Sequence, residues 1–466
     1  MTAKQGEISV FLSLILVCIL SLFLGLVESA RTTGARLYLE MAANSSMDSV
    51  MSQYNRNLWD MYHLLFLEAE SDEAMEESFI SYLDFYLEQD NLYPMKRKDV
   101  KVINAERMTD KAGSALEQEI LSYMKVRIPD LVKDAGAIET ILNIIEGADQ
   151  EKPDWDAAKE CMDEVTDPSL EEEIEIDWEK IRLLDRLEEI FRGDLLDLVI
   201  EDEVEVSTKS TRLQGIPSKE RMIESRTDEQ AKESNLLEQL MISEYCLTNF
   251  DSFRSRCERT LNPDQQKLQY EQEYLLFGKE SDRKNLIETV EKLLGLRGAL
   301  NLSYLLGQPE CRKEVDLFKL AISGGNTYIQ AVLSFFVLSL WAFGEAVWDV
   351  KLLMRGSSVP IVKDRSDWNL SMEEFIELRF LDDPPRSEGK GNDYQDYLRI
   401  LFMLMNRADR NFRIMDVIQW NVQSVQEDFL VKDCISTVEI QTVVEERHLF
   451  LRKETYSRTT VTSGYY

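Results

Sequence analysis

The feature that most constrains this chain is an uninterrupted apolar run near its N-terminus. Residues 8–27 read ISVFLSLILVCILSLFLGLV and contain no charged side chain. Twenty helical residues extend about 30 Å, which matches the hydrocarbon core of a bilayer. We therefore predict an uncleaved, single-pass membrane anchor. The positions taken as membrane-spanning are Ile8, Phe11, Leu16, Leu20, Leu24 and Val27.

Two other interpretations of this run fit less well. A cleaved signal peptide needs small residues at positions −3 and −1, and a cut after Ala30 would place Glu28 at −3. A core helix is usually apolar on one face, whereas this run is apolar all round. Charge does not orient the anchor, because Lys4 and the α-amine on one side balance Arg31 and Arg36 on the other.

A helical stripe continues beyond the apolar run. Large apolar side chains recur at steps of three and four residues and are the candidate helix-packing positions Met47, Met51, Tyr54, Leu58 and Tyr62. Because no proline interrupts this stretch, we predict one helix from about residue 7 to about residue 67, roughly 90 Å long. The stripe should dock the chain's own body.

The segment nearest the lipid carries small residues. Ala30, Gly34 and Ala35 permit close approach of another helix, as small residues do between membrane helices. We therefore expect residues 30–39 to stay free for a partner helix, with Gly34 as a further candidate helix-packing position.

Composition predicts a mainly α protein of α+β class. Gly and Pro number only 19 and 10 of 466 residues, which favours long helices. The predicted regions are a transmembrane anchor (1–30), a helical stalk and first helical region (31–150), an acidic helix with a polar linker (151–235), and a helical body with C-terminal strands (236–466). A net charge of −33 disfavours nucleic acid as a partner.

Local patterns refine these regions. Residues 75–125 look like paired helices around the turn at Tyr93-Pro94. Residues 207–235 are polar and are predicted to be the main linker. Alternating residues from Val438 to Val443, with a β-branched and aromatic C-terminus, predict a closing β-hairpin.

A second apolar stretch, residues 328–350, leaves two interpretations open. Only thirteen residues, 331–343, lack a charge, so we favour a buried core helix over a second membrane span. Glu345 and Asp349 lie one turn apart on it. They are either an acid/base pair or, as we favour, a polar helix end paired to a base such as Arg355.

Motifs for metal or cofactor chemistry are missing from the sequence. The only histidines, His63 and His448, are far apart in sequence, and the six cysteines include no Cys-x-x-Cys. Cys246 and Cys257 either pair or are buried thiols. We therefore predict no catalytic, metal or cofactor-binding residues and no cofactor.

Several strings in the sequence carry a family resemblance. They are GEISVFLSLILVCILSLFLGLVESAR, SVMSQYNRNLWDMY, EYCLTNF, YEQEYLLFGKESDRKNL, WAFGEAVWDVKLL, VPIVKDRSDW and DYLRILFMLMNRADRNFRIMDVIQ. Together they resemble a domain-of-unknown-function family of single-pass membrane proteins of Gram-positive bacteria. That family is similar to the TadE/TadG-like pseudopilins of Tad pilus loci. A pilin has Glu five residues after its cleavage Gly, whereas here Phe11 follows Gly6 at that distance.

The resemblance implies a non-enzymatic structural or assembly component of a Tad-like pilus or secretion apparatus. Its partners would be membrane lipid and other proteins of that assembly, and its body would lie outside the cytoplasm. A membrane-tethered sensory or ligand-binding ectodomain is the alternative, and a membrane-bound enzyme is a third hypothesis. The acidic stretch 140–206 lies outside the resemblance.

Overall fold

The computed structural model places most of the chain in two compact units. Unit 1 comprises residues 1–122 and 425–466, and unit 2 comprises residues 123–424. The residues that the structure describes are 2–88, 93–127, 186, 190, 193, 195–201, 204–224, 235–257, 265–311, 313, 315, 327–385, 391–448, 450 and 454–465.

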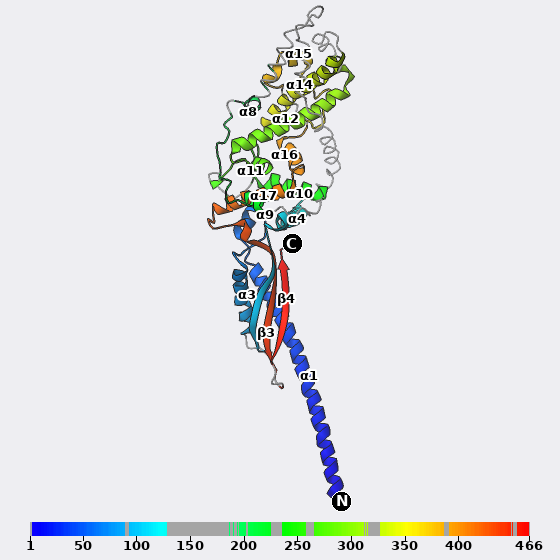
Figure 1. Ribbon diagram of the computed structural model, residues 1–466, viewed down its shortest axis with the longest axis vertical. Helices are drawn as coiled ribbons and strands as arrows, with labels where there is room; N and C mark the ends of the chain where they lie inside the picture. The colour runs from blue at the N-terminus through cyan, green and yellow to red at the C-terminus, as the bar shows by residue number, and fades with distance from the viewer. Residues whose placement is uncertain are drawn as a thin grey trace, which may run out of the picture. The chain divides into compact units, whose positions relative to one another are not determined.

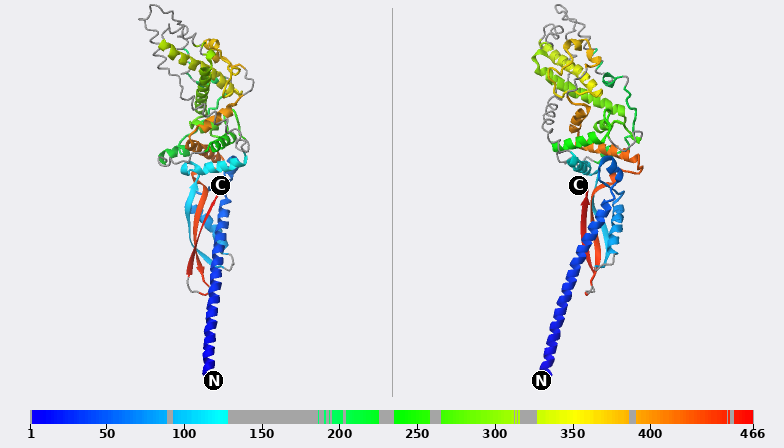
Figure 2. Two further views of the ribbon diagram at one scale, coloured as in Figure 1. Left: turned by 90° about the vertical axis from the view of Figure 1, so that its right-hand side faces the viewer. Right: turned by 180° about the vertical axis from the view of Figure 1, so that it is seen from behind.

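Unit 1 joins the N-terminal helices to the C-terminal strands. Its elements are α1 (Thr2–Met51), α2 (Arg56–Tyr62), β1 (Leu67–Glu68), α3 (Asp72–Leu87), β2 (Met95–Arg107), η1 (Asp110–Ala112), the first part of α4 (Ser114–Arg127), η6 (Val431–Asp433), β3 (Cys434–Arg447) and β4 (Glu454–Gly464). In Figures 1 and 2, α1 runs along the sheet and extends well beyond its end.

The sheet of unit 1 is antiparallel throughout. β3 is its central strand and pairs with β2 along one edge. Because a strand has only two edges, β1 and β4 share the other, with Leu67 opposite Ile435 and Glu454 opposite Arg447. The predicted C-terminal hairpin is confirmed by the β3–β4 pair.

Helices α1 and α3 cover one face of this sheet. Alternate β3 residues, such as Val438, Ile440 and Val444, point into an apolar core. α3 begins at its N-cap Ser71, whose side chain accepts from the backbone N–H of Ala74, and contributes Phe79. The other core side chains from α1 are Ala35, Leu39, Ala42, Ala43, Met47, Val50 and Met51.

Unit 2 is helical among its described residues. Its elements are α8 (Leu195–Val199), α9 (Pro217–Glu224), α10 (Leu236–Asn249), α11 (Glu271–Phe277), α12 (Asp282–Gly307), α14 (Thr327–Met354), α15 (Met372–Ile376), η5 (Arg379–Leu381), α16 (Tyr394–Met403) and α17 (Arg407–Gln423). The pairs α12–α14, α10–α16 and α9–α17 pack together. The expected helical body is confirmed.

The long N-terminal helix is shorter than predicted. α1 ends at Met51, and Tyr54 then forms an isolated antiparallel bridge with Leu67. Asn55 starts α2, because its side chain accepts from the backbone N–H of Leu58. The stripe Met47 to Tyr62 therefore belongs to two helices.

Two other expectations need correction. The second of the paired helices around Tyr93-Pro94 is largely a strand, β2, before α4 begins at Ser114. Described residues of the predicted linker pack on unit 2, since Ser207 Oγ donates to Asp282 Oδ2 at 2.5 Å and Ile216 is buried. The acidic helix expected within 151–206 lies largely outside the described residues.

Candidate functional site: the anchor and its junction with the sheet

The apolar run of α1 is exposed along its whole length. The predicted membrane-spanning side chains have exposed fractions of 37% to 65%, from Leu24 and Val27 at the low end to Phe11 at the high end. Among the described residues, α1 is the one helix long and apolar enough to cross a membrane. An apolar surface of this size is unstable in water and suits a lipid environment.

The same helix becomes part of a protein core directly after this run. Glu28, next to Val27, is buried, and from there one face of α1 faces the sheet. The core positions Ala35, Leu39 and Ala42 follow at steps of three or four residues. The change from exposed to buried therefore occurs within one residue of the predicted membrane boundary.

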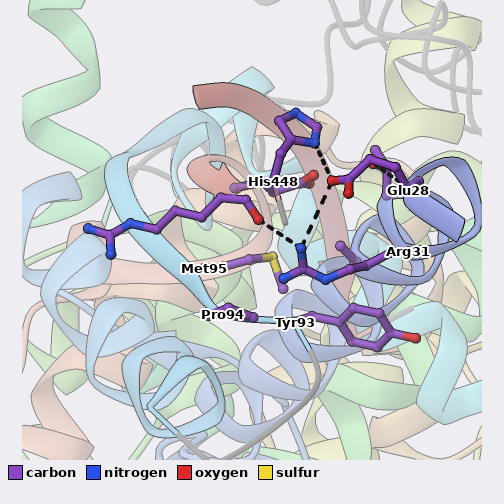
Figure 3. A pocket seen from close by; sticks show the side chains of 10 residues that line it. Glu28, Arg31, Tyr93, Pro94, Met95 and His448 are labelled. Carbon is purple, nitrogen blue, oxygen red and sulfur yellow. Dashed lines mark hydrogen bonds and ion pairs between the residues drawn. The ribbon is translucent and has the colours of Figure 1, made fainter. Parts of the chain in front are cut away.

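A polar junction fixes α1 to the end of the sheet (Figure 3). The Glu28 Oε1 and His448 Nδ1 atoms lie 2.6 Å apart, and His448 Nε2 lies 2.8 Å from Thr455 Oγ1. Arg31 Nη1 donates to the Arg447 carbonyl at 2.9 Å and lies 4.0 Å from Glu28 Oε1. Helix α1, the end of β3 and the start of β4 are thus connected.

This junction surrounds a shallow recess. Its empty volume, open solvent included, is about 230 Å³. The lining residues are Glu28, Arg31, Thr32, Ala35, Tyr93, Pro94, Met95, Glu446, Arg447 and His448. Since the polar groups in it bond mainly to one another, the junction is better suited to holding elements together than to binding a substrate.

The predicted helix-packing residues divide into two groups. Met47 and Met51 lie in the core between α1 and the sheet, and Leu58 and Tyr62 are fully buried on α2. Tyr54 is only half-buried, because it lies in the turn between the two helices. They pack within the chain, as expected for the stripe.

The segment expected to stay free is packed on one side. A Cβ built on Gly34 would lie 2.4 Å from Tyr93 Oη, and Ala35 and Leu39 are buried. The small residues therefore bring α1 close to Tyr93 of the same chain. The opposite side does remain open, with Leu37 and Met41 exposed by 59% and 62%.

In unit 2, Glu345 and Asp349 are part of a fully buried charge network. Lys363 Nζ contacts both carboxylates, and lies 2.6 Å from Asp349 Oδ1. Arg297 Nη2 lies 3.0 Å from Asp349 Oδ2 and Asn301 Nδ2 donates to the same oxygen. The prediction that Arg355 pairs with these two carboxylates is wrong, because Arg355 pairs with Glu201 and Asp383.

This network has the character of a structural contact. Glu345 accepts the backbone N–H groups of Asn369 and Leu370, so both its oxygens are occupied. Burial raises the pKa of Glu345 above its ordinary value. Burial alone would also raise the pKa of Asp349. The positive charges of Lys363 and Arg297 outweigh the effect of burial, so the pKa of Asp349 lies below its ordinary value. Two cations balance two anions, which stabilises this buried arrangement.

Other buried ionisable groups of unit 2 are likewise bonded within the protein. Glu273 accepts from the Phe253 N–H and from the Tyr394 hydroxyl, and burial raises its pKa to about 7. Asp416 accepts from the Tyr274 hydroxyl at 2.7 Å, and burial raises its pKa to about 6.

Neither thiol nor metal chemistry stands out in the part of the chain that the structure describes. Cys246 and Cys257 form no disulfide with each other, and burial raises the pKa of Cys246 to about 12. No group of three or more His, Cys, Asp or Glu side chains there is placed to hold a metal ion.

Comparison with known families assigns the chain. Residues 173–446 match the model of a family of unknown function, DUF5702, over more than half of the chain. The chain belongs to this family. No curated protein and no solved structure matches it. The DUF5702 match includes the buried network of unit 2 and most of β3, and it begins well after α1.

Sequence reasoning missed the junction because its members are distant in the chain. Glu28 and His448 are separated by 420 positions, and nothing in their local sequences links them. One signal was available: Glu28 is the first charge after the apolar run, and His448 is one of only two histidines. In this DUF5702 protein, one of the two histidines, His448, lies where the apolar run of α1 ends and its contact with the sheet begins.

Proposed function

We propose that this chain is a non-enzymatic, pseudopilin-like subunit of a Tad-like pilus or secretion apparatus. It is anchored by α1, and its units lie outside the cytoplasm. The observation that carries the proposal is the double role of α1, which is exposed and apolar up to Val27 and part of the sheet's core from Glu28 onwards. A helix of this kind resembles the first helix of a pilin.

The open side of α1 supports an assembly role. Leu37 and Met41 lie about 15 and 21 Å beyond Val27 along the helix, past the roughly 5–8 Å of headgroups on each side of a bilayer. Lipid therefore does not cover these exposed apolar side chains. A protein partner, such as a helix of a neighbouring subunit, would bury them and gain hydrophobic free energy.

Substitutions on this side test the assembly role. We expect Leu37→Glu with Met41→Glu to abolish cross-linking of the full-length protein to its partners in membranes, with little change in thermal stability. The matched control is Phe85→Glu with Ile103→Glu, which adds the same charges at exposed apolar positions of unit 1 away from α1. Equal cross-linking of both double variants would contradict the proposal.

The orientation needs its own experiment. Protease added to protoplasts should digest both units if they lie outside the cytoplasm. Protection in intact protoplasts, with digestion only after lysis, would reverse the orientation and exclude a role in an external assembly.

A further inference from the structure

The end of the sheet where β3 stops and β4 starts lies beside the membrane boundary of α1. Glu28 follows Val27 directly, and its carboxylate contacts His448, one residue after β3. Arg31 binds the carbonyl of Arg447, the last residue of β3. Figures 1 and 2 show this end of the sheet next to the point where α1 extends away.

The other end of the sheet, a full strand length away, is hydrogen-bonded to the end of α1. The Tyr465 hydroxyl, just after β4, donates to the Met51 carbonyl at the end of α1. The 23 helical steps from Glu28 to Met51 cover about 35 Å, and the eleven residues of β4 cover about 36 Å. β4 therefore runs alongside α1, and its first residues are the ones nearest the lipid.

This membrane-proximal end exposes basic groups and buries acidic ones. Lys96 and Arg447 are exposed there. Glu445 is buried against Lys98 Nζ at 2.5 Å, and Glu446 is buried against the Ser457 hydroxyl. The exposed charges at Lys96 near the start of β2 and at Arg447 at the end of β3 are therefore basic, and Glu454 lies opposite Arg447 in the register.

An apolar side chain accompanies this charge. Phe450, two residues beyond His448, is 50% exposed. The sequence of 446–454 reads ERHLFLRKE, in which three basic residues lie between Glu446 and Glu454. Residues 449 and 451–453 lie outside the described residues, and Lys96, Arg447 and Phe450 are the described members of this surface.

We propose that this end of the sheet docks on the anionic surface of the membrane that α1 crosses. Arg447 and Lys96 bind lipid phosphates, and Phe450 enters the interface between headgroups and acyl chains. Basic residues beside an exposed aromatic ring are the usual means of interfacial binding. The inference rests on the membrane anchoring proposed above. A second contact would hold the sheet at a fixed height and angle.

Depth-dependent quenching tests the insertion of Phe450. The full-length protein carrying Phe450→Trp is reconstituted in phosphatidylcholine vesicles, with or without phosphatidylglycerol, that contain a nitroxide-labelled acyl chain. The matched control is Thr462→Trp, an exposed position at the far end of β4. Emission of each added Trp is taken as the difference from the unsubstituted protein.

We expect about twofold lower emission for Phe450→Trp than for Thr462→Trp in the anionic vesicles, since interfacial side chains lie about 5–10 Å deep. Lys96→Glu with Arg447→Glu should abolish this difference. Lys101→Glu with Arg458→Glu, the same charge change further along the strands, should retain it.

The outcomes distinguish docking of the sheet on the membrane from anchoring by α1. Equal quenching of both Trp variants, in protein that resists a high-pH wash, would overturn the docked end and leave the anchor standing. Quenching that is the same with and without phosphatidylglycerol would overturn the binding of anionic headgroups. Release of the protein by the wash would remove the anchor and this inference together.

Discussion

Helices α1 and α14 both carry long apolar runs, yet α1 exposes its run while the described part of α14 buries its own. From residue 335 onward, α14 packs inside unit 2, with Trp341 and Val347 among its buried side chains. The favoured interpretation of residues 328–350 as a core helix is confirmed for this part. The run of α1 has no burial within its apolar window.

The difference between the two helices is explained by charge rather than by apolar content. α14 carries Glu345, Asp349 and Lys351 on buried positions, and each needs partners that lipid does not supply. Lys351 Nζ, for example, donates to the carbonyls of Leu381 and Asp382. α1 carries no charge between Ile8 and Val27. Buried charges within the apolar stretch of α14, with partners elsewhere in unit 2, therefore distinguish this core helix from the charge-free run of α1.

The largest predicted effect follows from removing the run of α1. A chain that begins at Glu28 should remain in the supernatant after membranes are sedimented, because the exposed apolar surface has been removed and the junction retained. Fractionation beside the full-length protein measures this. If the shortened chain still resists a high-pH wash, α14 or another segment holds it in the membrane, and the comparison fails.

Breaking the charge network of α14 should have the next largest effect. Lys363→Met leaves Glu345 and Asp349 buried with Arg297 as the remaining cation, and we expect a loss of about 3–5 kcal/mol in the free energy of unfolding. Chemical denaturation measures this loss.

A matched control for this change is Arg355→Met. Arg355 pairs with Glu201 and Asp383 near the surface, so its loss should cost less than about 1 kcal/mol. Similar losses for the two variants would show that the charges of α14 are not held in a buried network.

A smaller effect distinguishes the two parts of α1 from each other. Gly34→Leu should destabilise unit 1 by about 1–3 kcal/mol, because its side chain collides with Tyr93. Gly25→Leu is the control, since a Cβ at Gly25 has no neighbour within 4 Å. Thermal melting of the full-length protein in detergent measures both variants.

A double variant checks the cause of this loss. Gly34→Leu with Tyr93→Ala should cost less than the sum of the two single changes, because the space vacated by the ring accommodates Leu. If the stability losses of the two single variants simply add, the collision with Tyr93 is not the reason that Gly34→Leu destabilises unit 1.

The sequence predicted the features that depend on local pattern. The long apolar N-terminal helix, the core helices and the C-terminal hairpin all follow from periodicity and charge. Strand β2 did not, because register shifts between Arg97 and Asp99 and between Val102 and Asn104 interrupt its alternation. The end of α1 at Met51 carries no Pro or Gly, so only the Asn55 cap marked it.

Candidate site residues were harder to predict because their partners are non-local. Spacing along one helix suggested Arg355 for Glu345 and Asp349, but a loop brings Lys363 back instead. Gly34 was predicted to contact a partner helix, whereas its close neighbour is Tyr93 of the same chain. Pairings of this kind depend on the tertiary fold.

The smallest predicted effect is a pH dependence of unit 2. Burial is the main cause of the raised pKa of Glu273, about 7 against an ordinary 4.5. The folded state therefore holds the proton more tightly than the unfolded state. This contribution to stability is complete below pH 4.5 and is lost as the pH rises through 7.

The measurement is the free energy of unfolding at pH 6 and pH 8. We expect unit 2 to be more stable at pH 6, with Glu273 contributing on the order of 1 kcal/mol of the difference. Glu273→Gln keeps an oxygen to accept from the Phe253 N–H but does not titrate, so it should reduce the difference by about that amount. Because the pKa of Asp416 is about 6, a smaller pH dependence of the free energy of unfolding should remain in this variant. An unchanged difference in Glu273→Gln would mean that the carboxyl of Glu273 does not take up a proton in this range. The carboxyl of Glu273 would then be charged at both pH values.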